Sequence, residues 1–159
     1  MPGFTVPPIS SRFADCLPVI LRAEGGFVDD PDDPGGRTNK GITQKTYTAW
    51  LTRHGEPSHD VKDIPDADVA AIYEADYWDA SGAARLAPPL DLIHFDCAVN
   101  CGVGRAAKLL GRAAGTARGY MAVREQYYRD LVKSKPQLAK FLPGWLNRLK
   151  HLRTAAGIP

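Results

Sequence analysis

The stretch at residues 90–100 combines helical spacing with apolar side chains on nearly every side. It carries Leu92, Ile93, Phe95, Cys97 and Val99, so no face of the helix is left for water. A helix that is apolar all round must be covered by other elements. The segment therefore predicts a helical bundle with residues 90–100 at its centre.

The flanking sequence supplies elements that could cover such a helix. Apolar residues at helical spacing predict helices at about residues 12–23, 44–54, 65–78, 105–114, 117–135 and 141–156. Pro18 should kink the first of these or delay its start. Residues 27–42 instead predict a short hairpin that turns at the Asp-Asp-Pro-Gly-Gly segment, residues 32–36. The predicted fold class is mainly α with a small β-hairpin, in one domain spanning residues 1–159.

Charge is divided unevenly along the chain. Residues 1–102 carry 8 Lys/Arg and 16 Asp/Glu, whereas residues 103–159 carry 12 Lys/Arg and 2 Asp/Glu. A basic C-terminal part of this kind suits an anionic partner. Nucleic acid is one such partner, but the sequence has no nucleic-acid-binding motif, and its Tyr and Trp spacing is that of packed helices.

The three cysteines predict neither a disulfide framework nor a metal site. Cys97 and Cys101 are four residues apart on one helix face, where a disulfide is strained, so reduced buried thiols are expected for them and for Cys16. Only His94 lies near them at ligand spacing, and we expect no metal and no organic cofactor. No long apolar span or signal peptide is seen, which predicts a protein that accumulates in a cytoplasm.

The segment at residues 24–43 is the one that appears built for chemistry. Glu24 falls in the last turn of the first predicted helix, and Gly25 and Gly26 end that helix. The negative end of a helix dipole disfavours a carboxylate there, so an ordinary helix would prefer Lys or Arg. Four aspartates follow within five positions, at residues 29, 30, 32 and 33. We interpret Glu24 as a general acid and the rest of the segment as the part that shapes its site.

This segment resembles the signature of glycoside hydrolase family 108, a lysozyme-like group of phage endolysins and bacterial muramidases. The resemblance rests on Glu24-Gly25-Gly26-Phe27, on Asp30-Pro31 and Asp33-Pro34-Gly35-Gly36, and on Thr38-Asn39 with Gly41-Ile42-Thr43. Phe95-Asp96 with Ala98-Val99-Asn100 and Gly102 is similar to the family's central helix, and Gly144-Trp145 with Asn147-Arg148 to its C-terminal end.

The resemblance implies a lysozyme-like fold and cleavage of the β-1,4 bond between N-acetylmuramic acid and N-acetylglucosamine in peptidoglycan. Glu24 occupies the family's catalytic position. A second carboxylate or an oriented water would stabilise the transition state from the opposite face of the sugar. Asp33, nine residues after Glu24 as in phage-type lysozymes, is the first candidate, and Asp30 is the second. Either aspartate could instead hold the Pro-Gly corner, and Glu24 could act alone.

Several polar and aromatic residues are candidates for substrate binding. Asn39 and Thr43 could orient a water or hold an N-acetyl group, although Thr43 is equally placed to cap the following helix. Asn100 could hydrogen-bond to the site wall. Tyr47 could line a sugar cleft, although an aromatic at helical spacing is more often core.

The sequence therefore predicts a monomeric N-acetylmuramidase that acts on peptidoglycan glycan strands, as a phage endolysin held in the host cytoplasm or carried in the virion. The basic part, residues 103–159, would complete the domain and contact anionic envelope polymers. The first alternative is a catalytically inactive lysozyme-like component of a phage particle or secretion apparatus. The second is a basic nucleic-acid-binding protein.

Overall fold

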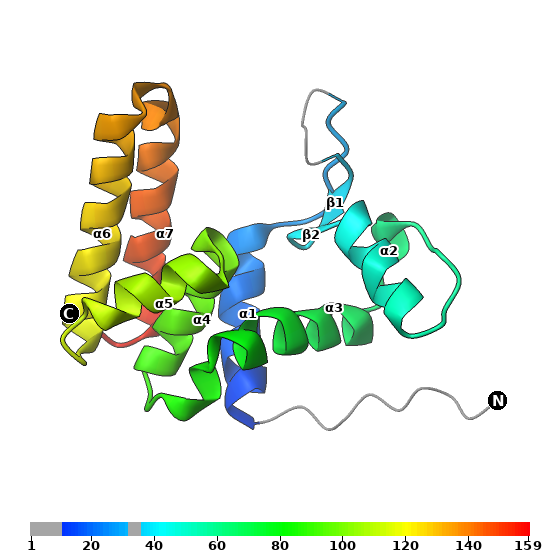
Figure 1. Cartoon of the computed structure of the whole chain (residues 1–159), viewed down its shortest axis with the longest axis horizontal. Helices are drawn as coiled ribbons and strands as arrows, with labels where there is room; N and C mark the ends of the chain where they lie inside the picture. The colour runs from blue at the N-terminus through cyan, green and yellow to red at the C-terminus, as the bar shows by residue number, and fades with distance from the viewer. Residues whose placement is uncertain (1–10, 32–35) are drawn as a thin grey trace. The chain divides into compact units, whose positions relative to one another are not determined.

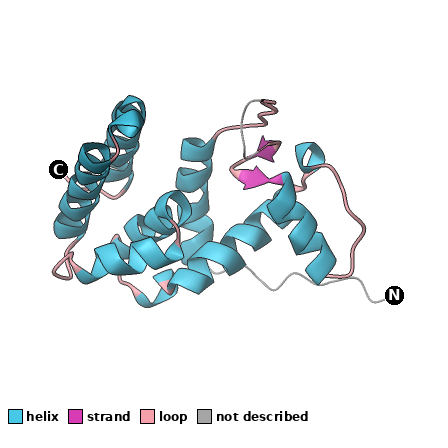
Figure 2. Ribbon diagram, turned by 45° about the horizontal axis from the view of Figure 1, so that its top comes forward, coloured by secondary structure: helices cyan, strands magenta, loops and turns pink. Residues whose placement is uncertain are grey.

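The computed structural model describes residues 11–31 and 36–159, and the chain separates into two compact units, Met1–Asp76 (unit 1) and Tyr77–Pro159 (unit 2). Helices dominate both units (Figures 1 and 2). The described part of the chain contains one two-stranded sheet, drawn in magenta in Figure 2, and it lies in unit 1. The predicted fold class, mainly α with a small β-hairpin, is confirmed. That residues 1–159 form a single domain stays a prediction.

Unit 1 combines three α-helices with the sheet. A short 3₁₀ helix, η1, precedes the last of these helices. In chain order the described elements of unit 1 are α1 (Ser11–Glu24), β1 (Thr38–Asn39), β2 (Ile42–Thr43), α2 (Gln44–Arg53), η1 (Val61–Asp63) and α3 (Asp66–Tyr73). The apolar stripes that predicted the helices are buried: Phe13, Cys16 and Ile20 on α1, Tyr47, Trp50 and Leu51 on α2, and Val69, Ile72 and Tyr73 on α3.

Three details of unit 1 differ from the sequence-based expectation. Helix α1 begins before Pro18 and continues through it, so the proline does not delay the start. Helix α3 passes directly into a π-helical turn, η2 (Glu74–Asp79).

The third difference is the turn of the hairpin. Strands β1 and β2 are antiparallel and are joined by a turn at Lys40 and Gly41, which the sequence did not predict. The predicted turn at residues 32–36 lies mostly outside the described residues, and Val28 and Thr38 on either side of it form an antiparallel bridge. A turn at Lys40 is hard to predict from sequence because Lys40 has a positive φ of 50°, which residues other than glycine rarely adopt.

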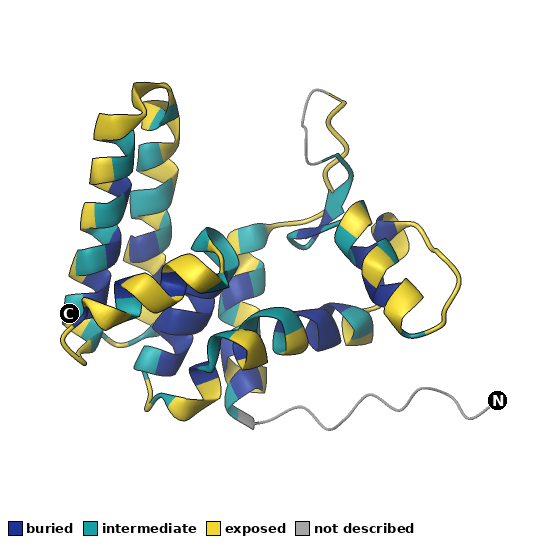
Figure 3. Cartoon of the chain, viewed as in Figure 1, coloured by how far each residue is buried: buried dark blue, intermediate teal, exposed yellow. Residues whose placement is uncertain are grey.

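Unit 2 is organised around the apolar helix. Its described elements are η3 (Ala83–Arg85), α4 (Leu90–Cys101), α5 (Val103–Gly111), α6 (Ala117–Ser134), η4 (Pro136–Phe141) and α7 (Leu142–Ala155). Helix α4 packs against η3, α5 and α6, while α6 also packs against α7. Every residue from Asp91 to Ala98 is buried, and α4 is correspondingly dark in Figure 3. The prediction of a central helix is thus confirmed within unit 2.

Buried polar groups in unit 2 join its helices. The Asp96 carboxylate on α4 accepts hydrogen bonds from Arg124 on α6 (2.8 Å) and Arg148 on α7 (3.1 Å). Arg124 has no exposed surface, and Asp96 is 1% exposed. His94 is also buried, and burial is the main cause that lowers its pKa. Its Nδ1 atom lies 2.7 Å from the Tyr120 hydroxyl.

The three cysteines are free thiols, as expected, although Cys101 is half-buried and not fully enclosed. Within residues 11–31 and 36–159, no helix combines the length and the apolar character that crossing a bilayer requires.

Candidate active site

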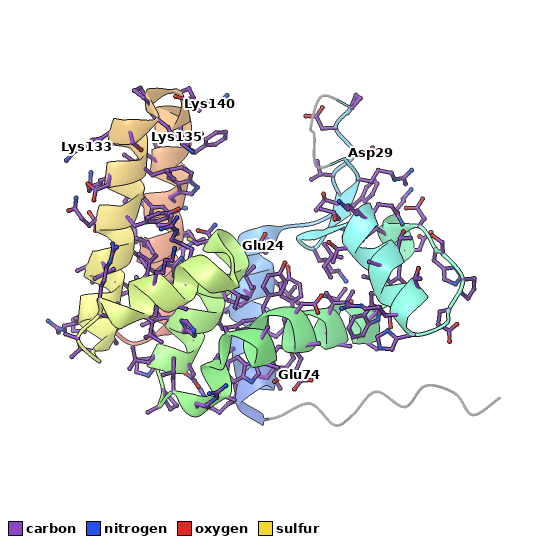
Figure 4. All side chains as sticks on the ribbon, in the orientation of Figure 1. Glu24, Asp29, Glu74, Lys133, Lys135 and Lys140 are labelled. Carbon is purple, nitrogen blue, oxygen red and sulfur yellow. The ribbon has the colours of Figure 1, made fainter. Side chains whose placement is uncertain are left out.

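Glu24 is the last residue of α1 and is half-buried (Figure 4). Gly25, which follows it, has a φ of +78° and donates its backbone N–H to the Leu21 carbonyl at 3.2 Å. This left-handed glycine ends the helix as the sequence predicts. The chain then leaves the helix axis and sets the Glu24 carboxylate at the helix terminus.

The Lys40-Gly41 turn lies directly against Glu24. A Cβ atom built on Gly41 would lie 2.9 Å from Glu24 Oε2 and 3.0 Å from Glu24 Cγ. Residues with a side chain cannot approach another group this closely without displacement. The register of the sheet, with Thr38 opposite Thr43 and Asn39 opposite Ile42, leaves Lys40 and Gly41 as a two-residue loop with positive φ at both positions. Such loops match the twist of the strands that they join.

Tyr73 on α3 reaches the same place. Its hydroxyl oxygen lies against the position that a Gly41 Cβ atom would take, and it donates a hydrogen bond of 2.6 Å to the Lys40 carbonyl. The Glu24 carboxylate, the Tyr73 hydroxyl and the turn thus meet around one glycine. The sequence analysis did not identify Tyr73 as a site residue. The available signal was that a buried Tyr, unlike Phe, needs a partner for its hydroxyl.

The segment that follows Glu24 is held by cations. Arg37 donates a hydrogen bond of 2.7 Å to Asp60 and also lies 3.9 Å from the Asp29 carboxylate. The guanidinium of Arg37 and the ammonium of Lys62 both lie over the Phe27 ring, at 5.5 and 5.8 Å from its centre. These contacts hold Phe27 and Asp29 beside Arg37, the residue that precedes β1.

Of the two candidate aspartates, the structure describes only Asp30. Asp33, the first candidate, lies outside the described residues, and so does Asp32. Asp30 is exposed on the segment between α1 and β1. A catalytic role for either aspartate stays a prediction.

Asn39 and Thr43 both have structural partners in unit 1. The buried Asn39 amide donates to the carbonyls of Val61 (3.2 Å) and Lys62 (2.9 Å), and so ties β1 to η1. The Thr43 hydroxyl accepts from the Thr46 N–H at 3.1 Å and is the N-cap of α2. The capping alternative is therefore confirmed for Thr43, while substrate contact by either residue stays a prediction.

Tyr47 lies away from the Glu24–Gly41 contact. It lines a cavity of about 310 Å³ whose lining does not include Glu24. Its hydroxyl donates to Asp68 at 2.9 Å, and burial, followed by this carboxylate, raises the pKa of Tyr47 to about 12. The cavity is lined by Tyr47, Trp50, Leu51, His54, Glu56, His59, Pro65 and Asp68. A role for Tyr47 in binding sugar stays a prediction.

Asn100 belongs to unit 2, at the end of α4. Its side-chain carbonyl accepts a short hydrogen bond from the Tyr128 hydroxyl, which in turn accepts from Arg124 at 3.0 Å. Asn100 is thus joined to the Asp96 cluster, and a role at the site wall stays a prediction. The described residues contain no group of three or more His, Cys, Asp or Glu side chains that could hold a metal ion.

Comparison with known proteins identifies the class. The family model for glycosyl hydrolase 108 matches residues 17–102, which include Glu24, the turn and helix α4. The chain belongs to this family, and it is a glycoside hydrolase with a lysozyme-like fold. The family and the fold together indicate peptidoglycan hydrolysis.

One solved structure gives a similarity over nearly the whole chain. The structure of Brucella abortus SagA is similar with a TM-score of 0.69 and 30% sequence identity. The match covers 91% of this chain and 93% of that one. No curated protein matches the chain.

Proposed function

We propose that this protein is an N-acetylmuramidase that cleaves the β-1,4 bond between N-acetylmuramic acid and N-acetylglucosamine, with Glu24 as the general acid. The single observation that carries the proposal is the placement of Glu24. A carboxylate at the C-terminal end of α1, half-buried and packed against Gly41, is set in a fixed position within unit 1. A surface residue at a helix end would need no such contact.

The chemistry requires an acid in this position. The glycosidic oxygen is a poor leaving group, and protonation by a carboxylic acid allows the bond to break as an oxocarbenium-like transition state forms. The carboxylate that remains then stays close to the departing sugar. The group on the opposite face of the ring is Asp33, Asp30 or a water, and the proposal does not depend on which of them acts.

The products of digestion test this proposal. We expect that purified peptidoglycan treated with the protein yields disaccharide-peptides with muramic acid at the reducing end, which borohydride reduction and mass spectrometry identify. Glu24→Gln should yield none, because the amide keeps the shape and cannot donate the proton. Free peptide stems would mean an amidase or peptidase. Binding of peptidoglycan without any product from the wild type would favour the inactive structural component.

A basic surface in unit 2 supports the proposal that the protein contacts anionic envelope polymers. Lys133, Lys135 and Lys140 are exposed near the end where α6 meets α7 (Figure 4). The Lys133 side chain is 77% exposed, and its contact with Asp130 is a loose 3.9 Å. Cations of this kind attract polyanions from a distance, and salt weakens the attraction.

Binding to isolated envelopes tests that role. The triple variant with Gln at these three lysines should bind less tightly and lose most of the salt dependence seen in the wild type. Its products on purified peptidoglycan should be unchanged. Binding that is equal in both proteins at low salt would overturn the role of this surface.

We further propose that the protein is an endolysin that stays in the host cytoplasm until release or is carried in the virion.

A further inference from the structure

The position of the Tyr73 hydroxyl beside Glu24 indicates a second residue that matters for the acid. The side chain is 1% exposed, yet its hydroxyl lies at the one place in unit 1 where the turn meets Glu24. A phenylalanine would fill the same volume. What the tyrosine adds is a single hydroxyl, and that hydroxyl donates a hydrogen bond of 2.6 Å to the Lys40 carbonyl.

The Lys40 carbonyl is part of the peptide group that leads into Gly41. A hydrogen bond to this carbonyl therefore fixes the orientation of the peptide against which the Glu24 carboxylate packs. Glu24 Oε2 and Tyr73 Oη both lie within 3.0 Å of the position that a Gly41 Cβ would take. The space beside the acid is thus bounded by the glycine and the phenol, with no room for a methyl group.

Helix α3 contacts the turn through residues at both of its ends. At its C-terminal end the buried Tyr73 bonds to the Lys40 backbone, and at its N-terminal end Asp66 pairs with the Lys40 ammonium. The Asp66 side chain is 91% exposed, so water and salt screen this pair. The buried hydroxyl is consequently the anchor that water cannot replace.

We propose that Tyr73 is a positioning residue for Glu24, acting through the Lys40-Gly41 turn, with Gly41 as the surface against which the acid is held. The proposal rests on the proposed function of Glu24. Tyr73 donates its one proton to the Lys40 carbonyl, so it supplies no proton to the substrate. Its effect is on the placement of the carboxylate, and small errors in placement slow a chemical step strongly.

The experiment compares kcat and KM of purified Tyr73→Phe and wild type on soluble, uncrosslinked glycan strands. We expect kcat to fall by about 10- to 100-fold with KM within about twofold, since the turn positions the acid and does not bind sugar. Two controls match the change. Asp66→Asn removes the exposed anchor of the same turn, and Tyr120→Phe removes a buried hydroxyl from unit 2 that bonds to the Ala106 carbonyl. Both should keep the kcat of the wild type.

A second variant keeps the proposal testable if Tyr73→Phe is poorly folded. Gly41→Ala inserts a methyl that must displace Glu24 or the Tyr73 hydroxyl, and it should likewise lower kcat more than it raises KM. The proposal is overturned if Tyr73→Phe keeps kcat within about twofold of wild type, or if only its KM changes. If Glu24→Gln itself stays active, the proposed function has failed instead, and the two failures are thereby distinguished.

Discussion

In unit 1 the buried side chains of Asn39 and Tyr73 donate to backbone carbonyls, whereas in unit 2 the buried side chains of Asp96 and Arg124 bond to each other. The first arrangement shapes the backbone next to a carboxylate. The second, centred on Asp96, Arg124 and Arg148, joins three helices.

The two units also differ in charge. Unit 1 carries 7 Lys/Arg and 13 Asp/Glu, and unit 2 carries 13 Lys/Arg and 5 Asp/Glu. The difference suggests that unit 1 positions the acid, while unit 2 supplies a stable frame and a basic surface. Substitutions at Glu24 and Tyr73 should therefore lower activity, whereas substitutions in the Asp96 cluster should lower stability first.

The largest change in stability is expected at Asp96. Asp96→Asn leaves Arg124 and Arg148 buried or nearly so without a counter-charge, and we expect a loss of about 3–5 kcal/mol in the free energy of unfolding. Urea unfolding followed by tryptophan fluorescence measures it. Arg148→Gln, which keeps the Asp96–Arg124 pair, should lose less. A loss below about 1 kcal/mol for Asp96→Asn would show that the cluster is not the frame of unit 2.

The next largest change in stability is expected at Asn39, in unit 1. Asn39→Ala removes the amide that donates to the Lys62 carbonyl and one of the two donors to the Val61 carbonyl, and a loss of about 1–3 kcal/mol in unfolding free energy is expected. Because the amide is engaged by η1, KM should stay close to that of the wild type. A raised KM with unchanged stability would instead support the substrate contact that the sequence predicts.

Thr43 should show a smaller effect of the same kind. Thr43→Ala removes the N-cap of α2, which typically costs about 1 kcal/mol, and thermal or urea unfolding measures it. Thr43→Ser keeps the capping oxygen and is the matched control. Equal stability of the Ala and Ser variants would mean that the cap contributes nothing to unit 1.

The smallest expected effect is a difference in chemical reactivity between two thiols of unit 2, Cys101 and Cys97. A hydrogen bond from the Cys97 thiol, then one from the Tyr128 hydroxyl, lowers the pKa of Cys101, whereas the pKa of Cys97 is raised by its hydrogen bond to Cys101 and by burial. A lowered pKa means that the thiolate, the reactive form, is already present at lower pH. Iodoacetamide labelling at increasing pH, read by peptide mass spectrometry, should therefore modify Cys101 first. Equal labelling of Cys97 and Cys101 at neutral pH would contradict the assignment.

The parts that could be predicted from sequence are those governed by local pattern. Helical spacing and glycine stops predicted the helix ranges to within a few residues, and capping was one of the two alternatives for Thr43 because its chemistry is local. Glu24 was selected as a candidate because a carboxylate before two glycines is unusual at a helix end, and its catalytic role stays a prediction. These features need only neighbouring residues.

The remaining features depend on residues distant in the chain. The Lys40-Gly41 turn was missed because a lysine with positive φ is stable only where other elements hold it, and here Tyr73 does so from 33 positions away. Likewise, nothing in the spacing of Asp96, Arg124 and Arg148 indicated that they would meet. Buried polar partners of this kind are set by tertiary packing.

The most direct test of the central claim is the rate of glycan cleavage by Glu24→Gln, measured beside Glu125→Gln. Glu125→Gln makes the same chemical change in unit 2 and serves as the control. Among the contacts of the described residues, the Glu125 carboxylate pairs only with the exposed Arg129. We predict that Glu24→Gln loses about 10²- to 10⁴-fold in kcat with unchanged unfolding free energy, and that Glu125→Gln keeps the wild-type rate. Full activity in Glu24→Gln would contradict the account.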